Sequence, residues 1–142
     1  MLKQDDYIKA KLVEIGWRYA SHYGGGHLMG QHVMWAIANR VRAGWGSWLQ
    51  IIDSLPQTLA ENELPPLKHP SVWDAVFVKL LHVVDGIYDG SMPDLSKGGV
   101  YWGVLGKIER PWFLEKIVQA RNLDGEPVHQ RVIDMNAFSV WR

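Results

Sequence analysis

The feature that most restricts the fold of this chain is the helical spacing of its apolar residues in three glycine-bounded segments. Along residues 5–23 an apolar side chain returns every three or four positions, which places one stripe on a helix. The stripe consists of Ile8, Leu12, Ile15 and Tyr19. Residues 28–42 and a stretch from Pro70 or Ser71 to about Tyr88 repeat the pattern. We therefore expect three substantial helices.

The remaining segments are shorter and less periodic. Residues 48–52 form a short apolar segment, and residues 53–70 read as a long irregular loop with one turn of helix near Leu59. Beyond Gly90 the chain is rich in turn residues and then β-prone at 100–102, with a short helix expected from Pro111 and two short strands over 128–134 and 136–141. The prediction is a single domain over residues 1–142, of class α+β and mainly helical, with a small C-terminal β element.

Charge and composition exclude several functional classes. Fifteen Lys and Arg balance fifteen Asp and Glu, so the chain lacks the excess positive charge of a general nucleic-acid binder. It has no Cys, which removes disulfides, thiolate metal sites and a cysteine nucleophile. The N-terminal residues do not resemble a signal peptide, and no apolar run approaches the ~20 residues of a membrane span. We expect a soluble protein without membrane insertion.

Eight Trp residues are the one compositional anomaly. A buried indole fills a core, whereas an exposed one can stack on a sugar face or a base. For a single Trp the core interpretation is favoured, since most large aromatic rings are buried.

Few residues suggest metal or cofactor chemistry. His22, His27 and His32 are spaced five apart, so they do not share a helix face. Phosphate-binding, dinucleotide-binding and metalloprotease motifs are missing. Gly24–His27 could hold an anion with backbone amides, but three glycines at the end of a helical pattern favour a helix terminator. We predict no metal and no cofactor.

Two segments carry a family resemblance. The run GQHVMWAIANRV, residues 30–41, resembles the GQ-x-AVA-x-V-x-NRV helix of the SleB-like cell-wall hydrolases, found among spore cortex-lytic enzymes and bacteriophage lysins. Residues 89–102, DGSMPDLSKGGVYW, are similar to that family's G-x-x-x-DPT-x-GA-x-YY segment, with Leu95 and Ser96 in place of Pro and Thr. ERPWF and the final MNAFSVWR resemble its closing elements, with Asn136 and Ala137 at the usual Gly and His.

The resemblance implies a lysozyme-like domain that cleaves the glycan strands of peptidoglycan with one catalytic Glu in the first helix. Glu14 is the only Glu there. It lies further from the GQ pair than in the family, the EARGE context is missing, and counting back without an insertion reaches Ser21 or His22. Such an acid must be protonated, which a wall such as Trp17 would favour. The other interpretation is a helix carboxylate paired with Lys11 or Arg18.

Other site candidates also carry two interpretations. Asn39 has either a functional role, in orienting the catalytic Glu or a sugar acetamide, or a structural role. For Arg40 the structural role is favoured. Tyr101 and Trp102 match the family's aromatic pair, so they either line the sugar groove or fill the core. Asp94 is the nearest second carboxylate, but in MPDLSKGG it is better placed to cap a turn.

Two functions remain at this point. The first is a muramidase or a lytic transglycosylase of bacteriophage origin, acting on peptidoglycan. Transglycosylation fits more easily because it needs no second carboxylate. The second is a catalytically inactive virion or tail protein that keeps the scaffold and contacts other virion proteins. Either would reside in the host cytoplasm or the virion, and neither involves nucleic acid.

Overall fold

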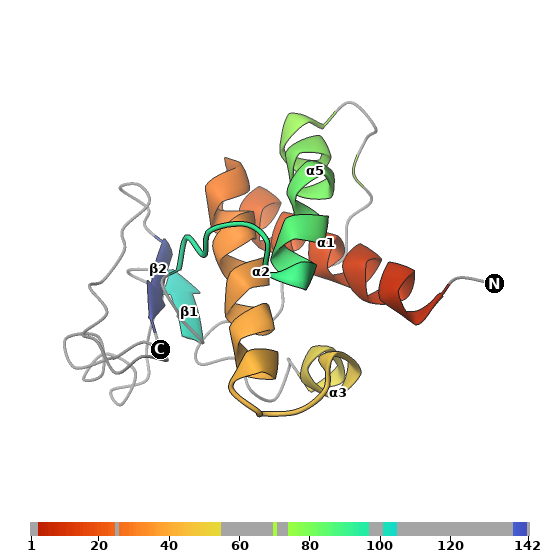
Figure 1. The fold of residues 1–142 in the computed structure, drawn as a ribbon. Coiled ribbons are helices and arrows are strands. Elements are labelled where there is room, and N and C mark those ends of the chain that lie inside the picture. The colour runs from red at the N-terminus through yellow and green to blue at the C-terminus, as the bar shows by residue number, and fades with distance from the viewer. Residues whose placement is uncertain are drawn as a thin grey trace.

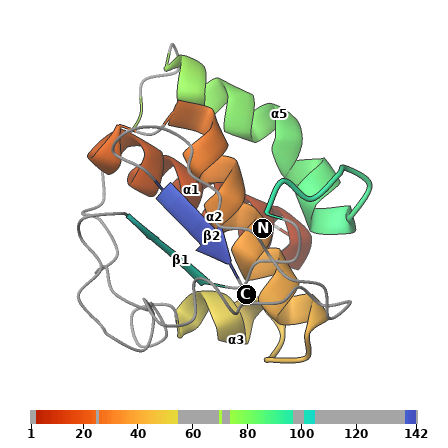
Figure 2. The same ribbon diagram turned by 90° about the vertical axis from the view of Figure 1, so that its left-hand side faces the viewer.

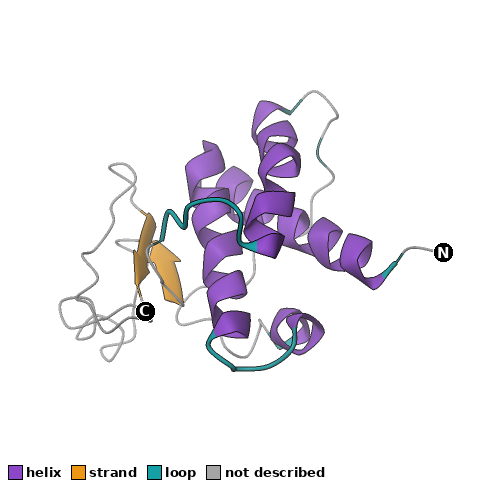
Figure 3. Ribbon diagram, viewed as in Figure 1, coloured by secondary structure: helices purple, strands orange, loops and turns teal. Residues whose placement is uncertain are grey.

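The computed structural model describes residues 3–24, 26–54, 70, 74–96, 101–104 and 138–141. These residues form four helices and two short strands, so the described part of the chain is mainly helical, as predicted (Figure 3). The elements are α1 (Gln4–Tyr23), α2 (Gly26–Arg42), α3 (Trp48–Asp53), α5 (Ala75–Asp89), β1 (Tyr101–Val104) and β2 (Phe138–Trp141). None of the described helices combines the length and apolarity needed to cross a membrane.

Helix α2 is the centre of the molecule (Figure 1). Its residues from Met29 to Arg40 are all buried, whereas a helix on the surface would bury only one stripe. Helices α1 and α5 pack along it, α3 lies near its C-terminal end, and both strands contact it. Side chains of α2, among them Asn39 and Arg40, can therefore contact several other elements of the fold.

Helix α1 forms as its apolar spacing predicts. Ile8, Leu12, Ile15 and Tyr19 are each at most 3% exposed and belong to the core. The helix ends at Gly24, which adopts a left-handed conformation with φ of 72° and donates its backbone N–H to the carbonyl of Ala20. The interpretation of the glycine run as a helix terminator is confirmed at this residue.

Glycines let α1 approach α2 closely. A Cβ atom on Gly16 would lie 2.9 Å from the carbonyl oxygen of Gly30, and one on Gly30 would lie 3.1 Å from the carbonyl oxygen of Gly16. Each glycine therefore faces the backbone of the other helix. The crossing depends on the absence of a side chain at both positions.

The starts of α3 and α5 are set by polar caps. The side chains of Ser47 and Gln50 form a reciprocal capping box at the start of α3, so the apolar segment from residue 48 is helical. In α5, Asp74 is the N-cap, and its carboxylate accepts from the backbone N–H of Phe77 at 2.9 Å. The helix therefore begins at Ala75, and the predicted start at Pro70 or Ser71 is wrong.

The strands pair antiparallel, with Trp102 opposite Val140 and Val104 opposite Phe138. Figure 2 shows the two strands side by side against α2. The predicted turn near Leu59, the helix from Pro111 and the strand over 128–134 lie outside the described residues.

Candidate functional site

Glu14 lies on α1 and is engaged in two ion pairs. Its carboxylate is 3.2 Å from the Lys11 Nζ atom and 3.7 Å from the Arg18 Nη1 atom. Its side chain remains 26% exposed. These are the two pairs expected from the i−3 and i+4 spacing. The carboxylate is thus held at the surface of the helix and reachable by solvent.

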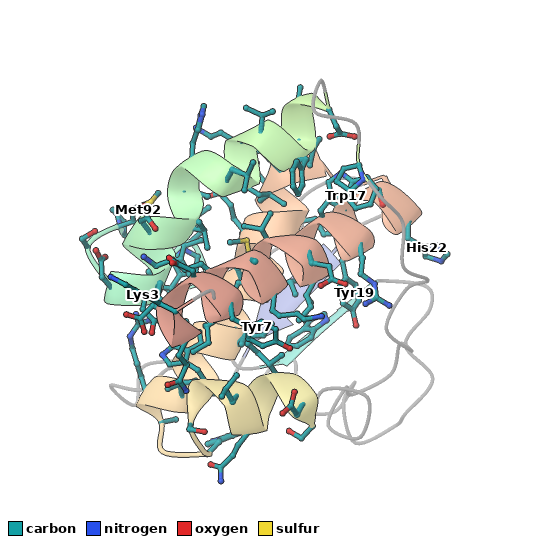
Figure 4. All side chains as sticks on the ribbon, turned by 90° about the vertical axis from the view of Figure 1, so that its right-hand side faces the viewer. Lys3, Tyr7, Trp17, Tyr19, His22 and Met92 are labelled. Carbon is teal, nitrogen blue, oxygen red and sulfur yellow. The ribbon has the colours of Figure 1, made fainter. Side chains whose placement is uncertain are left out.

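A pocket opens beside Glu14, between α1 and α3. It has a volume of about 230 Å³. Its lining consists of Tyr7, Lys11, Glu14, Ile15, Arg18, Ile52 and Asp53. Figure 4 shows Tyr7 on the side of α1 that faces α3.

The pocket combines the groups that a polar ligand requires. Two carboxylates, Glu14 and Asp53, and two cations, Lys11 and Arg18, balance in formal charge. Tyr7, 41% exposed, adds an accessible aromatic ring, and the Lys11 Nζ atom lies 5.8 Å from its centre. Such a set donates and accepts hydrogen bonds and offers an apolar face, as an uncharged, hydroxyl-rich ligand needs.

Asn39 is in the interior and holds a loop. It is 3% exposed, and its Nδ2 atom donates to Asp94 Oδ2 at 2.9 Å and to Ser96 Oγ at 3.1 Å. The other oxygen of Asp94 accepts from the backbone N–H and the hydroxyl of Ser96, at 2.8 and 2.7 Å. Asp94 therefore caps a turn, as predicted, and Asn39 joins this turn to α2. These contacts correspond to the structural interpretation of Asn39.

Arg40 lies over two indole rings. It is 1% exposed, and its Cζ atom lies 5.0 Å from the centre of the Trp45 ring and 4.8 Å from that of the Trp102 ring. Guanidinium groups stack readily on aromatic faces. The arrangement ties the end of α2 to β1 and to the turn that precedes α3.

Trp102 is a core residue. It is 2% exposed, and its ring meets Tyr19 edge-on with 5.9 Å between the centres. With the Arg40 guanidinium over the ring, no face of Trp102 is open to a sugar. The predicted role as a sugar contact is wrong for Trp102 in this structure, because the ring is enclosed by α1 and α2. Tyr101 is placed in β1 opposite Trp141, and its side chain lies outside the described residues.

The structure does not bring the three predicted site residues with described side chains, Glu14, Asn39 and Trp102, together in one place. Glu14 lines the pocket, whereas Asn39 and Trp102 belong to the buried contacts of α2. Sequence reasoning missed Tyr7 and Asp53, which reach the pocket only because α3 packs against α1. The clustering of Tyr7, Lys11, Glu14 and Arg18 at helical spacing was a usable signal, but nothing in the sequence singled out Asp53.

Histidines do not form a metal centre in the described part of the chain. No group of three or more His, Asp or Glu side chains there is arranged to hold an ion. His22 is exposed at the end of α1, as Figure 4 shows. His27 shares a 2.8 Å hydrogen bond with Gln31, and His32 is buried.

Titratable groups with shifted pKa values lie around α5. A hydrogen bond to Asp85 raises the pKa of Lys9. Burial raises the pKa of Tyr88, assisted by its hydrogen bond to Asp5. The Ser91 hydroxyl and backbone N–H lower the pKa of Asp89. The first two interactions join α1 to α5 and are separate from the pocket.

Comparison with protein families, curated proteins and solved structures finds no match to this chain. The resemblance to the SleB-like hydrolases therefore depends on sequence motifs alone.

Proposed function

We propose that this chain is a lysozyme-like protein that binds the glycan strands of peptidoglycan and cleaves their glycosidic bonds at the Glu14 pocket. The single observation that supports this is the position of Glu14. The carboxylate that the motifs imply as the acid lines a solvent-accessible pocket with a second carboxylate, Asp53, and an exposed ring, Tyr7.

Glu14 acts in this proposal as the proton donor to the leaving oxygen. Lys11 and Arg18 now contact its carboxylate, whereas a general acid must carry a proton. A glycan that enters the pocket excludes water and offers hydroxyl groups to both cations. That exchange releases Glu14 from its two ion pairs, as proton donation to the leaving oxygen requires.

The second carboxylate, Asp53, makes two mechanisms possible. In a hydrolase a second carboxylate activates water or attacks the sugar, whereas a lytic transglycosylase uses one carboxyl group and an internal sugar hydroxyl. The two routes differ in product, because hydrolysis leaves a reducing end and transglycosylation leaves an anhydro sugar. Product analysis of wild type and Asp53→Asn separates them, since only the hydrolytic route loses turnover with Asp53.

A second candidate is a catalytically inactive virion or tail protein that keeps this scaffold for contacts with other virion proteins. The ion pairs of Glu14 favour it, because Lys11 and Arg18 already satisfy the carboxylate as a structural pair would. The enclosure of Asn39 and Trp102 is equally compatible with a scaffold.

Clearing of purified sacculi tests the proposal. Wild type should lower the turbidity of a sacculus suspension, and Glu14→Gln, which keeps the shape but has no proton to donate, should abolish that loss. Asp85→Asn is the matched control, since its side chain is 75% exposed on α5 and pairs with Lys9. It should clear at the wild-type rate.

The possible results are distinct. No clearing by folded wild-type protein refutes the enzymatic proposal and favours the scaffold. Clearing that persists in Glu14→Gln shows that another group is the acid.

A further inference from the structure

Trp45 is an exposed indole in the turn between α2 and α3. It is 45% exposed, whereas Trp17, Trp35 and Trp102 are each at most 6% exposed. The turn is tightly fixed, because Gly44 adopts a left-handed φ of 83° and the backbone N–H of Trp45 donates to the carbonyl of Arg40 at 3.0 Å. The backbone that carries this ring is therefore fixed.

The ring itself is also held in place. The guanidinium of Arg40 lies over the ring of Trp45 and also over the ring of Trp102 in the core. Since Arg40 is 1% exposed and Trp102 is 2% exposed, the stack is supported from the interior. We call the solvent-accessible part of the Trp45 ring its outer face; the residue is 45% exposed.

We propose that the outer face of Trp45 is a stacking platform for a pyranose ring of the glycan strand. This inference depends on the proposed function for the identity of its ligand. A pyranose has an apolar face of C–H groups and a rim of hydroxyls, so its apolar face packs on a flat aromatic ring while the hydroxyls stay hydrated. A ring that is already immobile loses little conformational entropy when the sugar binds.

The position of Trp45 relative to the pocket supports the same ligand. Helix α3 begins at Trp48, three residues after Trp45, and its last two residues, Ile52 and Asp53, line the Glu14 pocket. Platform and pocket therefore border the two ends of one helix of 6 residues. An extended polymer can span the length of such a helix, so one glycan strand would contact both Trp45 and the pocket.

Cosedimentation with purified sacculi tests the platform. The measurement uses the full chain carrying Glu14→Gln, so that cleavage does not remove the binding surface. Trp45→Ala should weaken binding about tenfold, the scale of losing one aromatic stacking contact. Trp45→Tyr, which keeps a flat ring, should recover most of the loss.

Leu81→Ala is the matched control, because Leu81 is 46% exposed on α5 and is equally apolar. It should bind like the parent protein. Circular dichroism should show that each variant is folded at the assay temperature, so that a loss of binding is not a loss of folding.

Each result bears on the inference. Undiminished binding by Trp45→Ala overturns it, and equal losses in Trp45→Ala and Leu81→Ala show general apolar adhesion and overturn it too. Absence of binding by the folded parent also overturns it. If wild type clears sacculi but Trp45→Ala binds normally, the proposed cleavage stands and the platform fails. If binding depends on Trp45 but wild type never clears, the platform stands and the cleavage fails.

Discussion

Replacing Asn39 by Ala should destabilise the protein substantially, because Asn39 holds the 94–96 turn against α2. The substitution removes a 2.9 Å hydrogen bond to a carboxylate oxygen of Asp94 and a 3.1 Å bond to the Ser96 hydroxyl. A bond to a charged group contributes about 1.5–3 kcal/mol and a neutral one about 0.5–1.5 kcal/mol. The free energy of unfolding should fall by roughly 2–4.5 kcal/mol, as their sum.

Urea unfolding followed by far-UV circular dichroism measures this loss. In a chain of this size the thermal midpoint should fall by about 10 °C. Ser96→Ala supplies the test of coupling, because Asn39 and Ser96 share Asp94 as a partner. The double variant should lose less stability than the two single losses added together.

The result that would refute this reasoning is a specific one. The turn is not held by Asn39 if the free energy of unfolding of Asn39→Ala lies within about 1 kcal/mol of the wild-type value. That threshold is the contribution of one ordinary hydrogen bond. If that stable variant also fails to clear sacculi that wild type clears, Asn39 acts in the site and the structural interpretation is wrong.

Two further perturbations test the packing of α1. Gly16→Ala should destabilise by about 1–3 kcal/mol although Ala favours helix, because the new Cβ atom would meet the Gly30 backbone. Gly24→Ala meets no atom within 4 Å, so it should cost only about 1–2 kcal/mol of left-handed strain. A loss of less than about 1 kcal/mol in Gly16→Ala would argue against the close crossing of α1 and α2. Tyr88 has a pKa raised above its ordinary 10.0 by burial and by its bond to Asp5, so its contribution to stability is present below pH 10 and is lost as the pH rises through the folded pKa. Tyr88→Phe should therefore show a smaller fall in urea midpoint than wild type between pH 9 and 11, and parallel curves would contradict this linkage.

Local patterns predicted the helices well, because their determinants are local. The i, i+4, i+7, i+11 apolar residues of α1 are all buried, and the spacing around Glu14 predicted both of its ion pairs. The start of α5 was misplaced because apolar spacing does not mark a first turn. The capping carboxylate of Asp74 does mark it.

The site was less predictable because its geometry is set by packing between distant segments. Asp53 reaches the Glu14 pocket through the contact of α3 with α1, which no spacing rule encodes. Trp45 and Trp102 both contact Arg40, yet only one of them is exposed. Residue type alone cannot say which of the two indoles is buried.

The adjacency of Asn39 and Arg40 on α2 has a consequence for how this chain is compared with others. One residue secures the 94–96 turn, and the next secures β1 through Trp102. Selection for stability alone would preserve such a pair, whether or not the chain is an enzyme. The Asn-Arg pair therefore indicates an intact architecture, and evidence for enzymatic activity must come from the groups around Glu14.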